Sequence, residues 1–264
     1  MTFTDAKQRF SSRVADYVRY RPGYPSALIE LLRKECGLKS NSDEQVVVDI
    51  GSGTGLLSKL FVQNGNLVVG IEPNEEMRRA GDEFLKDYEN FASRAGSAEA
   101  TGIARESTDF IVVGQAFHWF EPSATRREFA RILKPGGWVA VMWNDRRIGE
   151  TAFGRAYEDL LLRFGTDYAK VREAYPEAAE MEQFFGAENA RRAELPNFQE
   201  FDFEGLAGRV RSSSYAPKEG HANYEPMMAA LRKLFEANQK LGRVRMEYTT
   251  QIYFGRLDAA RNAE

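Results

Sequence analysis

The stretch that decides the fold is Val46-Val47-Val48-Asp49-Ile50-Gly51-Ser52-Gly53-Thr54-Gly55. It opens with a β-branched, apolar run, which is typical of a parallel strand buried on both faces. Three glycines at alternate positions follow, and an apolar pattern with helical spacing begins at Leu56. Glycine permits a tight turn and lets a ligand lie against bare backbone. We therefore expect a strand, a ligand-binding turn and a helix over residues 45–64.

Strand and helix patterns alternate after this turn, which predicts a parallel sheet with right-handed crossovers. Before the turn, residues 5–37 are expected to be helical with a break at 21–25, and Ser26 is expected to cap the second of these helices. The elements expected after the turn are strands at 67–71, 91–95, 108–113 and 138–143, and helices at 74–88 and 123–133.

The character of the sequence changes after Asn144. Residues 148–195 carry helical patterns and few strand patterns, which indicates a helical insertion or lid. The elements expected beyond it are a sixth strand containing Phe198, Phe201 and Phe203, a helix over 224–239, and a last strand over Arg243–Phe254.

A carboxylate stands at the end of the second expected strand, 21 residues beyond Gly51, in Gly70-Ile71-Glu72-Pro73. In this position Glu72 can accept hydrogen bonds from both hydroxyls of a ribose. A glycine turn can also close a strand–helix unit with no ligand at all. The strand order and Glu72 together favour a nucleoside site over that alternative.

The glycine spacing separates two nucleoside ligands, NAD and S-adenosylmethionine (SAM). Dinucleotide sites usually space glycines G-x-G-x-x-G, whereas this turn has G-x-G-x-G directly after Asp49. SAM has no phosphate, and its ammonium group needs an acceptor. Asp49 would repel a pyrophosphate but suits an ammonium, so the residues favour SAM.

Several segments along residues 8–145 resemble the class I SAM-dependent methyltransferases, particularly the methyltransferase domain 11 group with its trans-aconitate methyltransferase-like members. The N-terminal Tyr17-x-x-Tyr20-Arg21-Pro22-x-Tyr24-Pro25 also looks like a segment found in some members, and its tyrosines are expected either in a lid or packed on the sheet. The segments of the core that carry the resemblance are Val47–Gly55, Gly70–Pro73, Gly96–Ala100, Asp109–Val113, Gln115–Phe120 and Leu133–Gly137.

The resemblance implies a role for each matching position in binding SAM. For Ala98 and Glu99 the alternative is an ordinary helix start, and Gln115 could simply cap its strand. The implied roles are the methionine cradle for Asp49, Gly51, Ser52, Gly53 and Gly55, the ribose for Glu72, the adenine for Pro73, Ala98 and Glu99, the methionine and sulfonium for Gln115, and the cofactor site also for Arg21.

The resulting fold prediction is α/β, a Rossmann-like doubly wound seven-stranded sheet. The sheet is mostly parallel with an antiparallel last strand, and a helical insertion or lid is added to it. The predicted segments are an N-terminal helical lid at 1–40, a SAM-binding core at 41–147, a helical insertion at 148–195 and C-terminal strands and helix at 196–264.

His118 is the candidate catalytic base, because it follows the fourth strand, where the open edge of such a sheet binds ligands. Phe117, Trp119 and Phe120 surround it, so a packed histidine is the competing interpretation. A carboxylate acceptor needs no base but needs cations. The candidate cations are Arg21, Arg146, Arg147, Arg209 and Arg211, with Arg146 and Arg147 preferred as an anion clamp, or else a solvated pair.

Composition narrows the class of protein. The net charge of −3 argues against nucleic acid as a partner, and no apolar run of spanning length is present, so we expect a cytoplasmic protein. One cysteine and two histidines leave little material for a metal site. The predicted function is transfer of a methyl group from SAM to a small molecule, and a homodimer is left open. An NAD-dependent oxidoreductase and a non-enzymatic SAM-binding protein are the alternatives.

Overall fold

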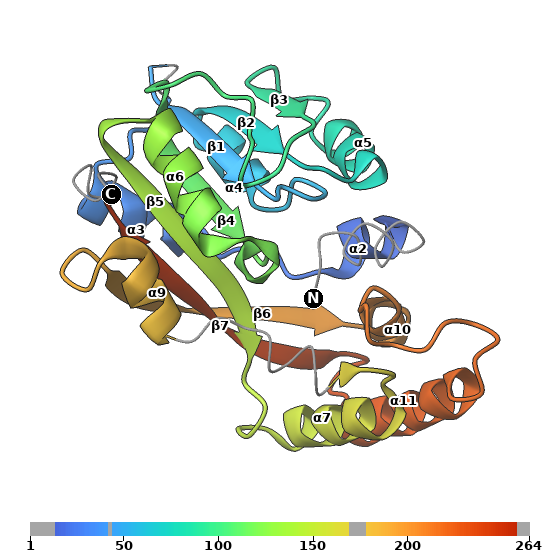
Figure 1. The fold of residues 1–264 in the computed structure, drawn as a ribbon. Helices are drawn as coiled ribbons and strands as arrows, with labels where there is room; N and C mark the ends of the chain where they lie inside the picture. The colour runs from blue at the N-terminus through green and yellow to red at the C-terminus, as the bar shows by residue number, and fades with distance from the viewer. Residues whose placement is uncertain (1–13, 42–43, 169–177, 258–264) are drawn as a thin grey trace.

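The structure, a computed structural model, describes residues 14–41, 44–168 and 178–257. A seven-stranded sheet forms its centre, in the order β3-β2-β1-β4-β5-β7-β6 (Figure 1). The pairs among the first five strands are parallel, whereas β7 runs antiparallel to both β5 and β6. The strands are β1 Val46–Ile50, β2 Leu67–Ile71, β3 Phe91–Arg94, β4 Thr108–Gly114, β5 Leu133–Arg146, β6 Arg191–Phe201 and β7 Val244–Gly255. The predicted Rossmann-like sheet with an antiparallel last strand is confirmed.

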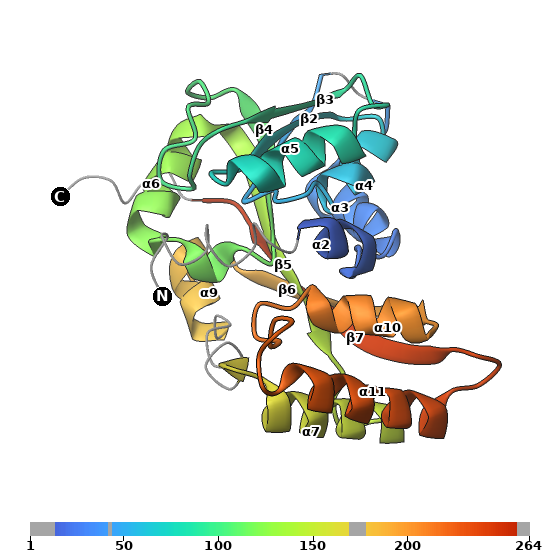
Figure 2. The same cartoon turned by 90° about the vertical axis from the view of Figure 1, so that its right-hand side faces the viewer.

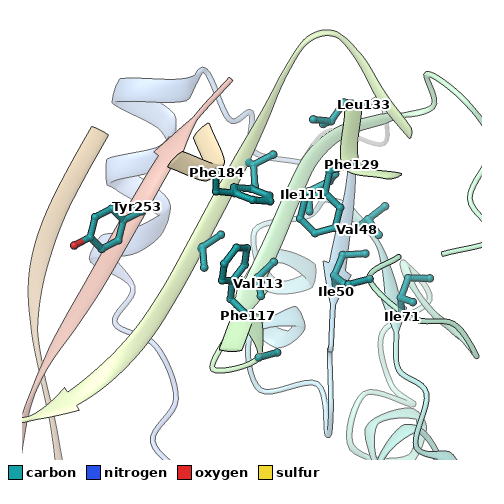
Figure 3. Packing of buried hydrophobic residues seen from close by; sticks show 14 of the residues in the cluster. Val48, Ile50, Ile71, Ile111, Val113, Phe117, Phe129, Leu133, Phe184 and Tyr253 are labelled. Atoms are coloured by element: carbon teal, nitrogen blue, oxygen red, sulfur yellow. The ribbon is translucent and has the colours of Figure 1, made fainter. Parts of the chain in front are cut away.

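Helices cover both faces of the sheet. On one face, α6 (Pro122–Ile132) and α9 (Ala178–Phe185) pack on apolar side chains of the strands. Figure 3 shows Phe129 and Phe184 of these helices beside Ile111 and Val113 of β4. On the other face, α3 (Ala27–Cys36) and α4 (Ser58–Gln63) pack on the alternate residues of the same strands. Burial on both faces explains the near-continuous apolar runs of β1 and β4.

A second core lies at one end of the sheet. Strand β5 pairs with β4 only as far as Met142, but it continues alongside β7 to Arg146. The long strands therefore project past the carboxyl end of the parallel strands. Helices α7 (Ala152–Phe164), α10 (Phe203–Arg211) and α11 (Tyr224–Asn238) gather on this projection (Figures 1 and 2). The remaining helices are α2 (Val14–Tyr20), α5 (Glu75–Phe84) and the short η2 (Phe117–Trp119).

The structure differs from the predicted elements at three places. Strand β6 begins at Arg191, so the last part of the range 148–195 is strand and not helix. Phe203 lies in a helix and not in the sixth strand, because the side chain of Asp202 accepts a hydrogen bond from Gly205 N (2.8 Å) and starts α10. Ser26 precedes α3 but makes no capping hydrogen bond with its side chain.

The predicted helical residues 5–13 and part of the predicted insertion, 169–177, lie outside the described residues. Within the described ranges, none of the helices has the length and apolar character that crossing a bilayer requires.

Candidate functional site

The glycine turn after β1 is built so that side chains are excluded from it. Gly51 and Gly53 adopt φ values of 68° and 56°, in the left-handed region that favours glycine. A Cβ on Gly51 would lie 2.6 Å from the Cβ of Ala116. The amide of Gly51 donates to the carbonyl of Ile71 (2.8 Å), which ties the turn to the end of β2. The turn thus presents bare backbone at the carboxyl edge of the sheet.

Glu72 holds this turn in place from the end of β2. One carboxylate oxygen accepts a hydrogen bond from Gly53 N (2.9 Å), and the other accepts one from Asn74 N (2.8 Å). Asn74 in turn caps α5 with its side chain. Glu72 is buried, and each of its oxygens has a further lone pair, so the carboxylate both orders the turn and keeps acceptor capacity.

Asp49 supplies a buried carboxylate at the base of the turn. It is completely buried, and its Oδ2 accepts a hydrogen bond from Ser58 Oγ (2.6 Å). Its Oδ1 is buried without a hydrogen-bond partner. Burial raises the pKa of Asp49 to about 7, and the nearby Glu72 adds to the rise, while the Ser58 hydrogen bonds oppose it. A cationic ligand group at Oδ1 would relieve this cost.

Gln115 occupies a strained backbone position at the end of β4. Its φ is 58°, which is uncommon for a residue other than glycine. The backbone amide donates to Met142 O (2.9 Å), and the side-chain amide lies 3.5 Å from Asn144 O. Strain of this kind concentrates at ligand sites, and it points Gln115 toward the same edge as the glycine turn.

A cavity of about 370 Å³ opens where these residues meet. We call Asp49, Gly51, Ser52 and Gly53 its loop wall. Gln115, His118 and Arg21 also line it, so the structure brings together seven of the predicted site residues. The other predicted residues do not line this cavity; they are Gly55, Glu72, Pro73, Ala98 and Glu99.

Ala98 and Glu99 form a tight turn and not a helix start. Ser97 and Ala100 exchange backbone hydrogen bonds (3.2 Å each) on either side of them. Ala98 is buried, and the carboxylate of Glu99 accepts a hydrogen bond from Glu121 N (3.0 Å) at the start of α6. Glu99 is thus engaged in ordering the chain.

His118 lines the cavity from η2, with its ring 4.8 Å from that of Trp119. Burial lowers the pKa of His118 to about 4. The imidazole is therefore neutral near pH 7 and holds an added proton weakly.

The N-terminal segment crosses over the cavity from α2. Tyr20 packs against Gly208 of α10, a position where any Cβ would collide with the ring. Arg21 donates to Ser212 O (3.0 Å), and Tyr24 joins it in lining the cavity. Figure 2 shows α2 beside α10. Of the three tyrosines expected in this segment, two contact the site region, and the side chain of Tyr17 lies outside the described residues.

A basic wall faces the loop wall; we define it as Arg146, Tyr168, Arg209 and Tyr215. Arg146 contacts Glu158 (3.2 Å) and also donates to the Tyr168 hydroxyl. The Tyr168 and Tyr215 rings lie 4.8 Å apart. Arg209 is buried beside them.

The expected clamp of Arg146 with Arg147 is not formed. Arg147 is partly exposed, bonds to Glu150 (2.7 Å) and does not line this cavity. Adjacent residues of a strand point to opposite faces, so the two arginines cannot share one ligand. Arg146 meets Arg209 instead, which α10 delivers from 63 residues farther along the chain.

Comparison with known proteins agrees with the loop wall. Residues 48–141 match the methyltransferase domain family. The segment from β1 to β5 is a methyltransferase domain. An uncharacterized methyltransferase of Schizosaccharomyces pombe is 33% identical over 138 residues, 52% of this chain and 53% of its own. One of Mycobacterium tuberculosis is 34% identical over 147 residues, 55% of this chain and 56% of its own. The chain thus spans about half the length of the curated relatives it matches.

Solved structures show the same fold as this methyltransferase domain and its additions. A candidate type II methyltransferase of Anaeromyxobacter dehalogenans superimposes with a TM-score of 0.64 at 20% identity, covering 90% of this chain and 98% of its own. A phosphoethanolamine N-methyltransferase of Haemonchus contortus, solved with S-adenosylhomocysteine (SAH), gives 0.56 at 15% identity over 97% of this chain and 59% of its own. None of these comparisons identifies the trans-aconitate-like subgroup, which stays a prediction.

Sequence reasoning missed Tyr168, Tyr215 and Glu158. They lie in segments of α7 and the loops around it, with no motif and no short spacing to link them to the glycine turn. The only usable indication was indirect: a helical region with many aromatic residues follows a ligand-binding core.

Proposed function

We propose that this protein transfers a methyl group from SAM to a small-molecule acceptor. The observation that carries the proposal is the unpartnered, buried Oδ1 of Asp49 on the wall of a cavity lined by bare glycine backbone. An ammonium group at that oxygen would satisfy the acceptor and compensate the buried charge. A pyrophosphate there would be repelled, which disfavours an NAD-dependent oxidoreductase.

The residues present fit the parts of SAM. Asp49 would accept from the ammonium group, and Arg21 would donate to the α-carboxylate across the same cavity. Gly51 and Gly53 leave room for the methionine chain, because a side chain at Gly51 would fill its path. Glu72 would accept from the ribose hydroxyls, with Pro73, Ala98 and Glu99 toward the adenine. When bound, SAM supplies an activated methyl group on a sulfonium.

The chain's own contribution to the reaction is alignment and exclusion of water. The N-terminal segment closes over the cavity, with Tyr20 seated on Gly208. Such closure holds the acceptor in line with the methyl group and removes water that would compete. We propose that His118 contacts the acceptor as a neutral imidazole. Its lowered pKa makes it a weak base, so an acceptor that carries its own lone pair suits this site.

The test is incubation with methyl-labelled SAM and a fractionated extract of small metabolites. We expect label to pass to a small molecule in at least one fraction, and no transfer with a Gly51→Ala variant. Tight SAM binding without transfer to any fraction would support the alternative of a non-enzymatic SAM-binding protein.

A further inference from the structure

The basic wall carries a positive charge that the described part of the chain leaves uncompensated. Arg209 is 4% exposed and lines the cavity. Its hydrogen bonds go to two neutral groups, Ser213 Oγ (2.9 Å) and Tyr248 Oη (3.4 Å). Among the residues that the structure describes, no carboxylate lies within ion-pair distance of its guanidinium. A buried arginine without a counter-charge is costly to keep.

Arg146, the other arginine of this wall, already has its counter-charge. Glu158 lies 3.2 Å from Arg146 Nη2, and it also accepts a hydrogen bond from the Tyr168 hydroxyl (2.6 Å). The pair is buried, with side chains 13% and 7% exposed. The wall therefore keeps about one net positive charge, located on Arg209.

Tyr215 reports the same positive potential. Burial alone would raise the pKa of its phenol, yet Arg146, Arg209 and Arg21 together outweigh burial and lower the pKa to about 8. A phenol is stabilised as its anion only where the surrounding potential is positive. Tyr215 thus marks this part of the cavity as a place that favours a negative charge.

The remaining charges at the cavity are used elsewhere if SAM binds as proposed, and the inference rests on that function. Asp49 would pair with the ammonium group and Arg21 with the α-carboxylate. Asp145 also lines the cavity, and its carboxyl interacts with Arg192 and Glu194 of β6. The sulfonium and Arg209 are then the two positive charges left for an acceptor to face.

We propose that the methyl acceptor is a small monocarboxylate with an apolar body, and that its carboxylate binds Arg209 beside Tyr215. A guanidinium holds a planar carboxylate through two parallel hydrogen bonds. One net charge on the wall matches a carboxylate better than a phosphate group, which carries about −1.5 to −2. The apolar body would lie against the rings and aliphatic side chains of the cavity, including Trp119, Ile148 and Tyr168.

The proposal separates Arg209 from a purely structural arginine. A structural cation would stabilise the free protein, so Arg209→Met would lower Tm. An anion-binding arginine is instead a cost in the absence of ligand, so Arg209→Met is expected to leave Tm unchanged or raise it. Methionine suits the replacement because it fills a similar volume without charge.

The experiment measures thermal shifts of the full chain saturated with SAH. The probes are benzoate, phenylacetate, hexanoate and octanoate, each compared with its neutral amide, and phenyl phosphate. At least one acid is expected to raise Tm by several degrees while its amide does not. The shift should vanish in Arg209→Met, return in part in Arg209→Lys and persist in Arg147→Met, the matched exposed control.

Three results would overturn the proposal: no acid exceeding its amide, equal shifts in wild type and Arg209→Met, or phenyl phosphate exceeding every carboxylate. A lower Tm for Arg209→Met with unchanged acid shifts would make the residue structural. Stabilisation by SAH alone separates the two proposals. A protein that binds SAH but none of the acids keeps the proposed function and loses this inference.

Discussion

The two walls of the cavity are built in different ways. The loop wall comes from consecutive residues, Asp49 to Gly53, and offers mostly backbone. The basic wall comes from Arg146, Tyr168, Arg209 and Tyr215, four side chains spread over 70 residues and carried by β5, α10 and the loops near α7. The family match, 48–141, includes the first wall and ends before every residue of the second.

This contrast teaches where function can be inferred from a short stretch of sequence. A backbone cradle depends on glycine at fixed positions, because any Cβ would fill it, so its residues and spacing announce the ligand. A side-chain wall depends on where separate elements dock. Its residues become a site only when the projection of β5–β7 brings α10 back against the sheet.

The largest effect is expected from filling the cradle. Gly51→Ala places a Cβ 2.6 Å from that of Ala116, at a φ of 68°. We expect SAM affinity to fall by more than about 100-fold, because the backbone must move out of the ligand's path, and left-handed strain adds about 1–2 kcal/mol of destabilisation. Calorimetric titration and thermal unfolding measure the two effects.

Gly136→Ala is the matched control for this substitution. Gly136 has a φ of 81°, but an added Cβ would have open space around it. It should therefore lose similar stability and retain SAM affinity. Equal loss of affinity in both variants would show that strain, and not the cradle, controls binding.

A smaller loss is expected at Glu72. Glu72→Gln keeps one acceptor for the turn but removes the charge and one oxygen acceptor. Each charge-assisted hydrogen bond contributes about 1.5–3 kcal/mol, so SAM and SAH should bind about 10- to 100-fold more weakly. Adenosine, which keeps the ribose and lacks the methionine chain, should lose affinity by a similar factor as a competitor. A loss confined to SAM would contradict the ribose role.

The pH dependence of SAM binding tests Asp49. The pKa of Asp49 without ligand is about 7, and its ionised form is the one that pairs with ammonium. Lowering the pH from 7 to 5.5 protonates the carboxyl, so SAM affinity should fall by roughly tenfold. Asp49→Asn should bind weakly with a flat profile across this range.

That variant also isolates Asp49 from Asp145, whose pKa is raised by burial to about 6. If the pH dependence survived in Asp49→Asn, Asp145 would be its source and the ammonium assignment would be wrong.

The smallest effect is expected at His118. With a pKa of about 4, its imidazole is a weak proton acceptor. His118→Ala should lower kcat by less than about tenfold, whereas loss of a general base costs about 10²–10⁴-fold. Steady-state rates on the acceptor that takes up label decide between them. A loss in the larger range, with an inflection in the pH profile of kcat, would assign the base role to His118.

Much of the fold followed from the sequence, because strand burial leaves a pattern. The β-branched runs at β1 and β4 and the final strand β7 lie where the sequence predicted them. The start of β6 was placed too late. Residues 191–195 are Arg-Arg-Ala-Glu-Leu on an edge strand with mostly exposed side chains, so no apolar run marks them. Helix α10 depends on the Asp202 cap, which is a single polar residue after a phenylalanine-rich stretch.

The site divides in the same way as the fold. Asp49, the glycines and Gln115 were identified from local spacing, and they meet at one cavity. The arginine clamp was misassigned, because sequence adjacency suggested Arg146 with Arg147, while strand geometry turns them apart. Pairing Arg146 with Arg209 requires the packing of α10 on the projecting strands, and no local pattern encodes that.

The most direct test of SAM as the ligand is a calorimetric titration of the wild-type chain with SAM, SAH and NAD under identical conditions. One site per chain that binds SAM and SAH, with NAD at least about 100-fold weaker, is the predicted result, since a carboxylate at Oδ1 of Asp49 attracts ammonium and repels pyrophosphate. Binding of NAD in preference to SAM, or no binding of either SAM or SAH, would contradict it.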